Sequence, residues 1–374
     1  MRKMSLGVDL HKKQFTVYFL SEDHMVRELG VYETGQSGYE RFLGVCADLE
    51  QRGFELHAAV ETTGNARYFC SRLVGSGIEV TVVNTLKFKV IIQSVKKTDR
   101  HDARILAEFL EKNMLPESHL CSRESEEIRR LLKVRRSLVQ TMVSVKNQIH
   151  GMLTSYGIES RGGQLQSKKD RQRILCGLAD HEFGGNAAAA IASLFETIDQ
   201  LDALVKRQTQ LLQTLVAEDE DVALLMSIPG VGIITASTIR AYVDDIRRFG
   251  DAKQFASYMG LAPWVQNSAE SVRHGHITRR GPMDMRTAMV QCVLGMVRMK
   301  AKTGSYRLMR QYQELKRRKG SGQAIIAIAR KLSTIMYTML KTREPFDPIR
   351  MAQKKKYLEM QAAALDAANS RQAI

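Results

Sequence analysis

Long hydrophobic runs are missing from this sequence of 374 residues, and its N-terminus lacks an apolar signal core. The most apolar short stretch, "AAAAIASLF", is far below the roughly 18 residues that a membrane-spanning helix needs. The N-terminal stretch "MRKMSLGVDLHKK" has basic residues without the apolar core of a secretory signal. These absences predict a cytoplasmic protein that is not associated with a membrane.

Paired cysteines are missing as well. The five cysteines are scattered along the chain without a CxxC pair: Cys46, Cys70, Cys121, Cys176 and Cys292. This pattern is neither a disulfide framework nor a zinc site. We expect all five to be small buried apolar residues.

Charge of one sign is in excess. Lysine and arginine number 56 against 40 aspartates and glutamates, which gives a net charge of +16 and a pI near 9.7. Such a balance predicts attraction to a polyanion. Composition alone does not distinguish DNA from RNA.

Residues 1–121 have the pattern of an α/β domain. Apolar or alternating stretches such as "MSLGVDL", "QFTVYFL" and "FELHAAVE" are typical of strands. Stretches with three-four apolar spacing, such as "SGYERFLGVCADLEQRG", are typical of helices. The resulting order, β-β-β-α-β-α-β-α, predicts a mixed sheet with helices on its faces.

The rest of the chain has a helical pattern. Residues 122–218 contain two long series of apolar residues at three-four spacing, separated by the polar stretch "ESRGGQLQSKKDRQR". They predict an antiparallel, coiled-coil-like arm, although two amphipathic helices packed on a globular core would give the same pattern. Residues 219–345 indicate a compact helical domain, and residues 346–374 a helical tail.

Acidic residues stand out at three places in the α/β part. Asp9 lies inside an apolar strand, where an unpaired charge is costly, and Glu61 ends another strand. Asp99 and Asp102 are three residues apart, so they share one face of a helix. Taken alone, Asp99 would suit a helix N-terminus. The basic residues around this pair are Lys96, Lys97, Arg100, His101 and Arg104.

Four carboxylates gathered at one point would repel each other unless a cation lay among them. Mg²⁺ prefers such oxygen ligands, and Mn²⁺ is the expected substitute. Paired metals can position groups for phosphoryl transfer. We therefore expect Asp9, Glu61, Asp99 and Asp102 to bind metal, and the neighbouring bases Lys96, Lys97, Arg100 and Arg104 to contact a nucleic-acid backbone.

The stretch "LLMSIPGVGIITASTI" predicts a helix-hairpin-helix. Gly230 and Gly232 permit a tight turn, and backbone N–H groups at the next helix start can contact a phosphate. A plain helix-turn-helix connection explains the same residues. The basic composition favours the nucleic-acid interpretation.

The stretch from Gly260 to Arg286 is polar and basic, and it predicts a loop. A serine hydroxyl can attack a phosphodiester when its proton is removed and cations neutralise the phosphate. Serines are also common turn residues, so composition leaves both roles open. The candidate nucleophiles in this stretch are Ser268 and Ser271. The candidate phosphate contacts are Arg273, His274, His276, Arg279, Arg280 and Arg286. The nearby stretch from Glu314 to Ala324, "ELKRRKGSGQA", is a further candidate phosphate contact.

The motifs "GVDLHKK", "AVETTG" and "KKTDRHDARILAEFL" resemble the DEDD-type transposases of the insertion-sequence one-ten family. The resemblance covers about residues 4–345. It implies an N-terminal RuvC-like, ribonuclease H-like domain, a coiled-coil segment and a C-terminal transposase domain. By this match, Asp9, Glu61, Asp99 and Asp102 stand at the four family carboxylates.

The C-terminal stretch is similar to the family pattern GLxPxxxxSGxxxxxGxITxxGxxxLR. The resemblance implies that Ser268 is the nucleophile that becomes joined to DNA, with Ser271 as the alternative. This chain has Ala269 where the family has glycine and Met285 where it has leucine.

The resemblance also implies what the protein does. It predicts a transposase and site-specific DNA recombinase with a composite site, guided by a bridge RNA that pairs with donor and target DNA. Strand exchange needs several active sites, so dimers assembling into a tetramer are expected. Two alternatives are a RuvC-like junction nuclease that acts by metal-dependent hydrolysis and a non-catalytic nucleic-acid-binding protein.

Overall fold

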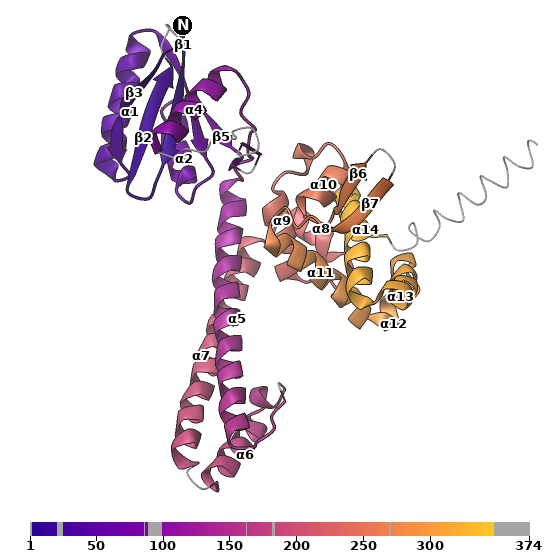
Figure 1. The fold of residues 1–374 in the computed structure, drawn as a ribbon. Coiled ribbons are helices and arrows are strands. Elements are labelled where there is room, and N and C mark those ends of the chain that lie inside the picture. Colours follow the sequence, from indigo (N-terminus) through magenta and orange to yellow (C-terminus); the bar gives the residue numbers. More distant parts are fainter. Residues whose placement is uncertain are drawn as a thin grey trace, which may run out of the picture. The chain divides into compact units, whose positions relative to one another are not determined.

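A computed structural model describes residues 2–20, 25–85, 87–88, 99–161, 163–181, 184–268 and 271–347 (Figure 1). The chain forms two compact units, Met1–Leu120 and Cys121–Ile374. Most of the predicted helical tail, from residue 348 onward, lies outside the described residues. Within them, no helix is long and apolar enough to cross a membrane.

A mixed sheet forms the first unit. Its described strands lie in the order β3-β2-β1-β4-β5, with β1 parallel to β4 and antiparallel to β2. The elements are β1 (Arg2–Leu10), β2 (Gln14–Leu20), β3 (Val26–Glu33), α1 (Gln36–Gln51), β4 (Phe54–Glu61), α2 (Ala66–Val74), β5 (Glu79–Val83) and α4 (Asp99–Glu111). This order is the predicted one, and the mixed α/β fold fits a RuvC-like domain.

The two faces of the sheet carry different helices. Successive residues of a strand point to opposite faces. Leu6 and Val8 of β1 pack with Phe42 of α1 and Phe69 of α2 in one buried cluster. The other face carries a second cluster, which joins strand residues to α4: Ala59, Val83, Leu106 and Leu110. Helix α4 therefore covers the face to which odd-numbered residues of β1 and β4 point.

The crossing of α4 over β1 depends on Gly7. A Cβ added at Gly7 would overlap the carbonyl oxygen of Ala103 and lie 2.5 Å from the backbone nitrogen of Ala107. Both obstructing atoms belong to the helix backbone, which cannot rotate away as a side chain could. Gly7, with the buried Ala103 and Ala107, thus sets how closely α4 approaches the sheet.

We expect Gly7→Ala to destabilise the protein by about 2–3 kcal/mol, because overpacking against backbone forces the helix away from the sheet. Urea unfolding followed by circular dichroism measures this change. Gly44→Ala is the matched control, since Gly44 lies within α1 and an added Cβ would meet nothing within 4 Å. That control should stabilise the helix by about 0.5–1 kcal/mol. Equal stability of the Gly7 variant and wild type would contradict the close crossing.

Helices α5 (Arg123–Ser155) and α7 (Gly185–Leu215) form the predicted arm (Figure 1). At one end, Ile128 and Leu212 join the core of the C-terminal helices. At the other end, Ile149 of α5 packs with Ile191 and Phe195 of α7. The two helices are therefore antiparallel, and both sequence interpretations hold in part, because the pair is an arm at one end and part of a globular core at the other.

The connection between α5 and α7 corrects a sequence prediction. The stretch interpreted as a polar connection contains η1 (Gln164–Gln166) and α6 (Lys168–Ala179), and α6 packs on α7. The hydroxyl of Ser167 accepts a hydrogen bond from the Asp170 backbone nitrogen at 3.3 Å. A serine followed three residues later by an acid is a recognisable helix start, so this signal was present in the sequence.

Charge placed in the arm seam should destabilise the arm. Val145 is half-buried against the cluster at the arm's end, so Val145→Asp should cost about 2–3 kcal/mol through burial of an unpaired charge. The control is Val143→Asp, because Val143 is 50% exposed, and its cost should stay within about 0.5 kcal/mol. Thermal unfolding by circular dichroism measures both. The same charge at Leu138 and Leu201, which are also half-buried, should act as it does at Val145.

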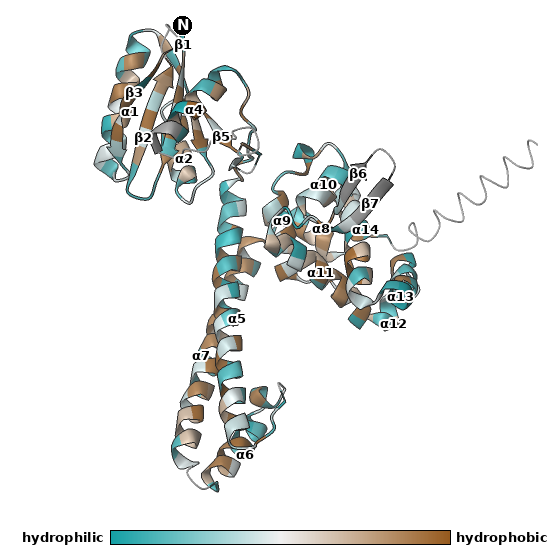
Figure 2. Cartoon of the chain, in the orientation of Figure 1, coloured by the Kyte–Doolittle hydropathy of each residue, from teal (hydrophilic) through white to brown (hydrophobic). Residues whose placement is uncertain are grey.

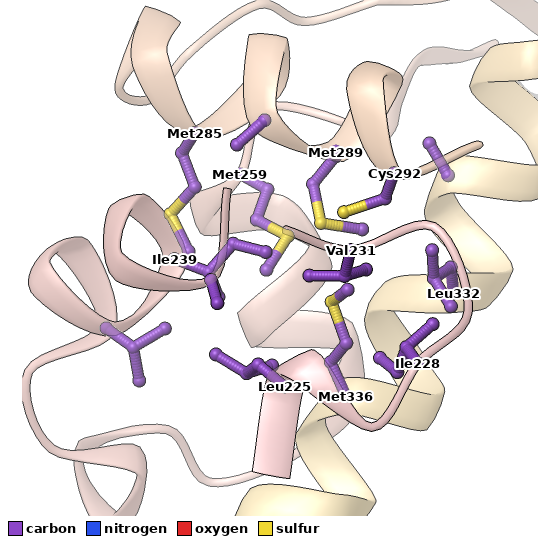
Figure 3. Packing of buried hydrophobic residues seen from close by; sticks show 14 of the residues in the cluster. Leu225, Ile228, Val231, Ile239, Met259, Met285, Met289, Cys292, Leu332 and Met336 are labelled. Carbon is purple, nitrogen blue, oxygen red and sulfur yellow. The ribbon is translucent and has the colours of Figure 1, made fainter. Parts of the chain in front are cut away.

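The C-terminal helices surround a methionine-rich core. The elements are α8 (Glu220–Met226), α9 (Ile233–Val243), η2 (Ile246–Arg248), α10 (Ala252–Tyr258), β6 (Pro263–Ser268), β7 (Ser271–Ile277), α11 (Met283–Arg298), α12 (Lys300–Thr303), α13 (Arg307–Lys319) and α14 (Ser321–Thr342). Figure 3 shows Ile228 and Val231, from the turn between α8 and α9, inserted among Met289 and Cys292 of α11 and Met336 of α14.

A polar network fastens the start of α5 to the end of α9. The Asp244 carboxylate, 7% exposed, accepts hydrogen bonds from the backbone nitrogen and hydroxyl of Ser122 and from the hydroxyl of Ser125. Arg240 donates to the Ser125 hydroxyl at 3.0 Å and to Asp219 at 2.9 Å. The base of the arm is thus held by part-buried, hydrogen-bonded polar groups as well as by apolar packing.

The stretch from Gly260 to Arg286 corrects a second prediction. It is not one loop, because β6 and β7 form an antiparallel hairpin and α11 begins at Met283. Polar hairpins of this kind lack the apolar alternation by which strands are found in sequence.

The cysteine prediction is also wrong at one position, since Cys176 is exposed while the other four are buried.

Candidate active site

Asp9 and Glu61 occupy equivalent places on neighbouring strands. The parallel register of β1 and β4 pairs Gly7 with Ala59 and Val8 with Val60, so the next positions are Asp9 and Glu61. Neighbouring strands lie about 4.8 Å apart. Gly7 and Ala59 face α4, and Asp9 and Glu61 each follow two residues later in the same strand. Both acids therefore point to the face that α4 covers. The sheet therefore brings the two strand carboxylates together.

Asp9 is held by its surroundings. Its side chain is 13% exposed, and His11 Nε2 lies 2.9 Å from Asp9 Oδ2. An ionised carboxylate only accepts hydrogen bonds, so the imidazole nitrogen is the donor. Asn65 Nδ2 donates to the His11 carbonyl oxygen at 2.9 Å, and Thr62 Oγ1 donates to the carbonyl of Val83. These bonds fasten the loop after Glu61 to both neighbouring strands.

The helical acids lie at the start of α4. Asp102 is half-buried and directly precedes Ala103, whose backbone meets Gly7. Asp99 and Arg100 begin the helix, but their side chains are not among those described. Lys96 and Lys97 lie outside the described residues. Arg104 forms an ion pair with Glu108, Nε to Oε1 3.0 Å, on the exposed surface of the helix.

The acids suit a divalent cation by their chemistry, since carboxylate oxygens are hard ligands. Asp9, Glu61 and Asp102 come from three elements at the same face of the sheet. In the part of the chain that the structure describes, however, no three such side chains are close enough to hold a metal ion. A bound ion would have to draw these three carboxylates closer together.

Ser268 and Ser271 close the β6–β7 hairpin. They are paired across it, Ser268 ending β6 and Ser271 beginning β7, so the backbone places both candidates at the same tip. Trp264, 51% exposed, lies over Gly275 on the opposite strand, where an added Cβ would be 2.8 Å from the indole ring. Sequence reasoning assigned no role to Trp264, although an exposed tryptophan beside arginines is a recognisable nucleic-acid feature.

The predicted arginine contacts differ in their surroundings. Arg279 and Arg280 are exposed. Arg286 instead donates from Nη1 to the carbonyl oxygens of Arg279 and Gly281, each at 2.9 Å, and so braces the connection from the hairpin to α11. The side chains of Arg273 and His274 are not among those described.

Met285, at the family leucine position, is fully buried in the core (Figure 3), where methionine and leucine are exchangeable in volume.

The two glycines of the α8–α9 turn have different surroundings. A Cβ at Gly230 would lie 2.5 Å from the carbonyl carbon of Gly295, so this glycine permits a close crossing of the turn over α11. Gly232 precedes α9 and is exposed, with nothing within 4 Å of an added Cβ. Gly230 thus has a packing role that the sequence did not indicate, and Gly232 is the more accessible of the two.

Comparison with known proteins finds transposases. A family model described as a transposase, of the DEDD type, matches residues 6–158, and the model of the "Transposase IS116/IS110/IS902 family" matches residues 222–308. The transposase for insertion sequence element IS1111A of Coxiella burnetii is 26% identical over 290 residues, 77% of this chain and 78% of that protein. A probable family 20 transposase of Pseudomonas aeruginosa is 24% identical over 350 residues, 93% of this chain and 100% of that protein. A pilin gene-inverting protein of Moraxella bovis is 26% identical over 357 residues, 93% of this chain and 98% of that protein.

The matched families and the similar proteins are transposases, and this chain is a DNA transposase, an enzyme that cleaves and rejoins DNA. The predicted alternative of a non-catalytic binding protein is thereby set aside. The chain belongs to the IS116/IS110/IS902 family of transposases. Membership of a DEDD-type transposase family implies the use of a divalent metal ion.

Proposed function

We propose that this transposase cuts and rejoins DNA through the hydroxyl of Ser268, acting with a metal site formed by Asp9, Glu61, Asp99 and Asp102. The observation that carries the proposal is the register of β1 and β4, which aligns Asp9 with Glu61 on the face covered by α4. Mg²⁺ is the metal that the oxygen ligands favour, and Mn²⁺ would replace it. The ion would neutralise phosphate charge near the carboxylates.

The serine chemistry has a defined product. The Ser268 hydroxyl would lose its proton to a base and form a new bond from its oxygen to phosphorus. The bond from phosphorus to the DNA 3′- or 5′-oxygen would break, and that oxygen would leave as a hydroxyl after taking up a proton. The phosphodiester energy would be kept in the serine–DNA ester. Attack on that ester by a hydroxyl of another strand would rejoin DNA and release the serine. Because the bond energy is retained, the DNA can be rejoined without another energy source. A nuclease that hydrolyses the phosphodiester would need such a source to rejoin the strands.

The test is denaturing electrophoresis of wild-type protein with an end-labelled substrate and a divalent metal. We expect labelled DNA that migrates with protein and returns to free DNA after protease digestion. Chelation of the metal should abolish the adduct. Cleaved DNA that never carries protein would favour the alternative, a RuvC-like junction nuclease acting by hydrolysis.

We further propose a bridge RNA as guide and a homodimer that assembles into a tetramer. The net charge of +16 supports binding of two polyanions. Exposed apolar side chains on the arm offer a surface for a second copy, each 40–47% exposed: Val134, Leu204, Leu211 and Leu215. Recombination should then require RNA transcribed from DNA flanking the reading frame, and ribonuclease treatment of the assembled complex should stop it.

A further inference from the structure

A cleft of about 870 Å³ lies in the C-terminal unit, between the β6–β7 hairpin, the end of α13 and the first turns of α14. Its volume falls within the roughly 300–1,000 Å³ typical of sites for small ligands. Residues from Pro263 and from the stretch Gly275–Ile277 form the hairpin side. The cleft is therefore built partly by the same hairpin that carries Ser268 and Ser271 at its tip.

The floor of the cleft is apolar. Leu261 is 1% exposed, and Ile277, Leu315 and Ile326 are half-buried around it. Figure 2 shows the hydrophobic ribbon of α14 beside the more hydrophilic α13. A floor of this kind gains free energy from a flat apolar surface such as an unpaired base, and gains little from a phosphate backbone.

The rim of the cleft is cationic. Arg279, Lys319 and Arg330 line it and are exposed, and no acidic residue is among the described residues that line it. None of the ion pairs of the described residues involves these three cations, whereas the neighbouring Arg318 lies 3.8 Å from Glu314. Three cations without acidic partners around an apolar floor attract a ligand with negative charge at its edge and an apolar centre.

We propose that this cleft binds unpaired nucleotides of a nucleic-acid strand, with bases against the apolar floor and phosphates on Arg279, Lys319 and Arg330. The inference rests on the proposed function, in which the hairpin presents Ser268 to a nucleic-acid strand. Ser268 lies five positions after Pro263 in β6, about 16 Å along an extended strand. A strand anchored in the cleft would thus run along the hairpin toward the serines. A duplex fits less well, because its base faces are already stacked.

Gly322 supplies a steric test. It lines the cleft in the first turn of α14, and an added Cβ would meet nothing within 4 Å. Gly322→Leu should therefore narrow the cleft without disturbing the helix. Gly151→Leu is the matched control, because Gly151 lies in α5, outside the cleft, and is equally open. Binding of the full-length chain to short labelled strands is measured by fluorescence anisotropy with oligo-dT, oligo-U and an abasic strand of equal length.

Wild type and Gly151→Leu should bind the base-bearing strands at least tenfold more tightly than the abasic strand, and Gly322→Leu should lose this preference. Tighter binding of either oligo-dT or oligo-U supports the proposal and identifies DNA or RNA as the source. Equal binding of abasic and base-bearing strands by wild type would overturn it, as would an unchanged preference in a folded Gly322→Leu variant.

The rim is tested by charge. Lys319→Gln with Arg330→Gln removes two phosphate contacts, which should lower the salt slope by about 1.4 and the affinity roughly 25-fold at 0.1 M salt, at about 0.7 per contact for single strands. Arg307→Gln with Arg310→Gln is the control of equal charge, taken from two exposed positions of α13 that do not line the cleft. Equal losses in the two double variants would overturn the rim assignment.

Cleft-dependent binding without a serine adduct would overturn only the serine chemistry, and an adduct formed by a protein without cleft-dependent binding would overturn only the cleft.

Discussion

DNA cut by the wild-type protein is expected to carry covalently attached protein, and Ser268→Ala is expected to lose that adduct together with strand cleavage. The substitution removes one oxygen and no charge. Loss of a nucleophile typically lowers turnover by about 10⁴-fold or more. Affinity for DNA and RNA should persist, because it comes mainly from lysine and arginine against phosphate.

Ser271→Ala is the matched control for this experiment. The two serines are cross-strand partners at the tip of one hairpin, so the two variants change the same kind of atom at the same place in the fold. Both are assayed on a denaturing gel with the same labelled substrate. Retention of the adduct in Ser268→Ala and its loss in Ser271→Ala would transfer the nucleophile to Ser271.

Loss of any site carboxylate is expected to abolish recombination while the fold persists. The variants are Asp9→Asn, Glu61→Gln, Asp99→Asn and Asp102→Asn. Each keeps the shape of the side chain and removes one negative ligand. Loss of groups that merely orient metal ligands costs about 10–100-fold in metal affinity, so loss of a ligand should exceed about 100-fold.

Metal binding is measured apart from activity, by the rise in melting temperature with added Mn²⁺ or Mg²⁺. Glu55→Gln is the matched control, because Glu55 lies on β4 three alternations before Glu61 and so points to the same face at the other end of the strand. It should keep both recombination and the metal-dependent melting shift. Wild-type recombination in Asp99→Asn alone would reduce that residue to a helix-capping role.

The strands of the first unit could be predicted because their signal is local. "MSLGVDL" and "FELHAAVE" show apolar runs that belong to buried strands in any arrangement. The β6–β7 hairpin was missed because its residues are mostly polar and lack the apolar alternation of a buried strand. Helix α6 was missed although its start, Ser167 with Asp170, was visible in the sequence.

The sequence by itself determined the chemistry available to this transposase: four acids in recognisable motifs, a serine in a basic stretch, an excess of cations and two long apolar helix patterns. Only the tertiary structure decided which of these groups lie near one another. The register of β1 against β4 aligns Asp9 with Glu61, and the missing side chain of Gly7 lets α4 cross near them. Likewise, the packing of Gly230 on α11 and the bonds of Arg286 to carbonyl oxygens gave structural roles to two residues predicted to bind nucleic acid. The physical reason is that composition and spacing are properties of neighbouring residues, whereas strand register, helix crossing and cleft walls join residues far apart in the chain.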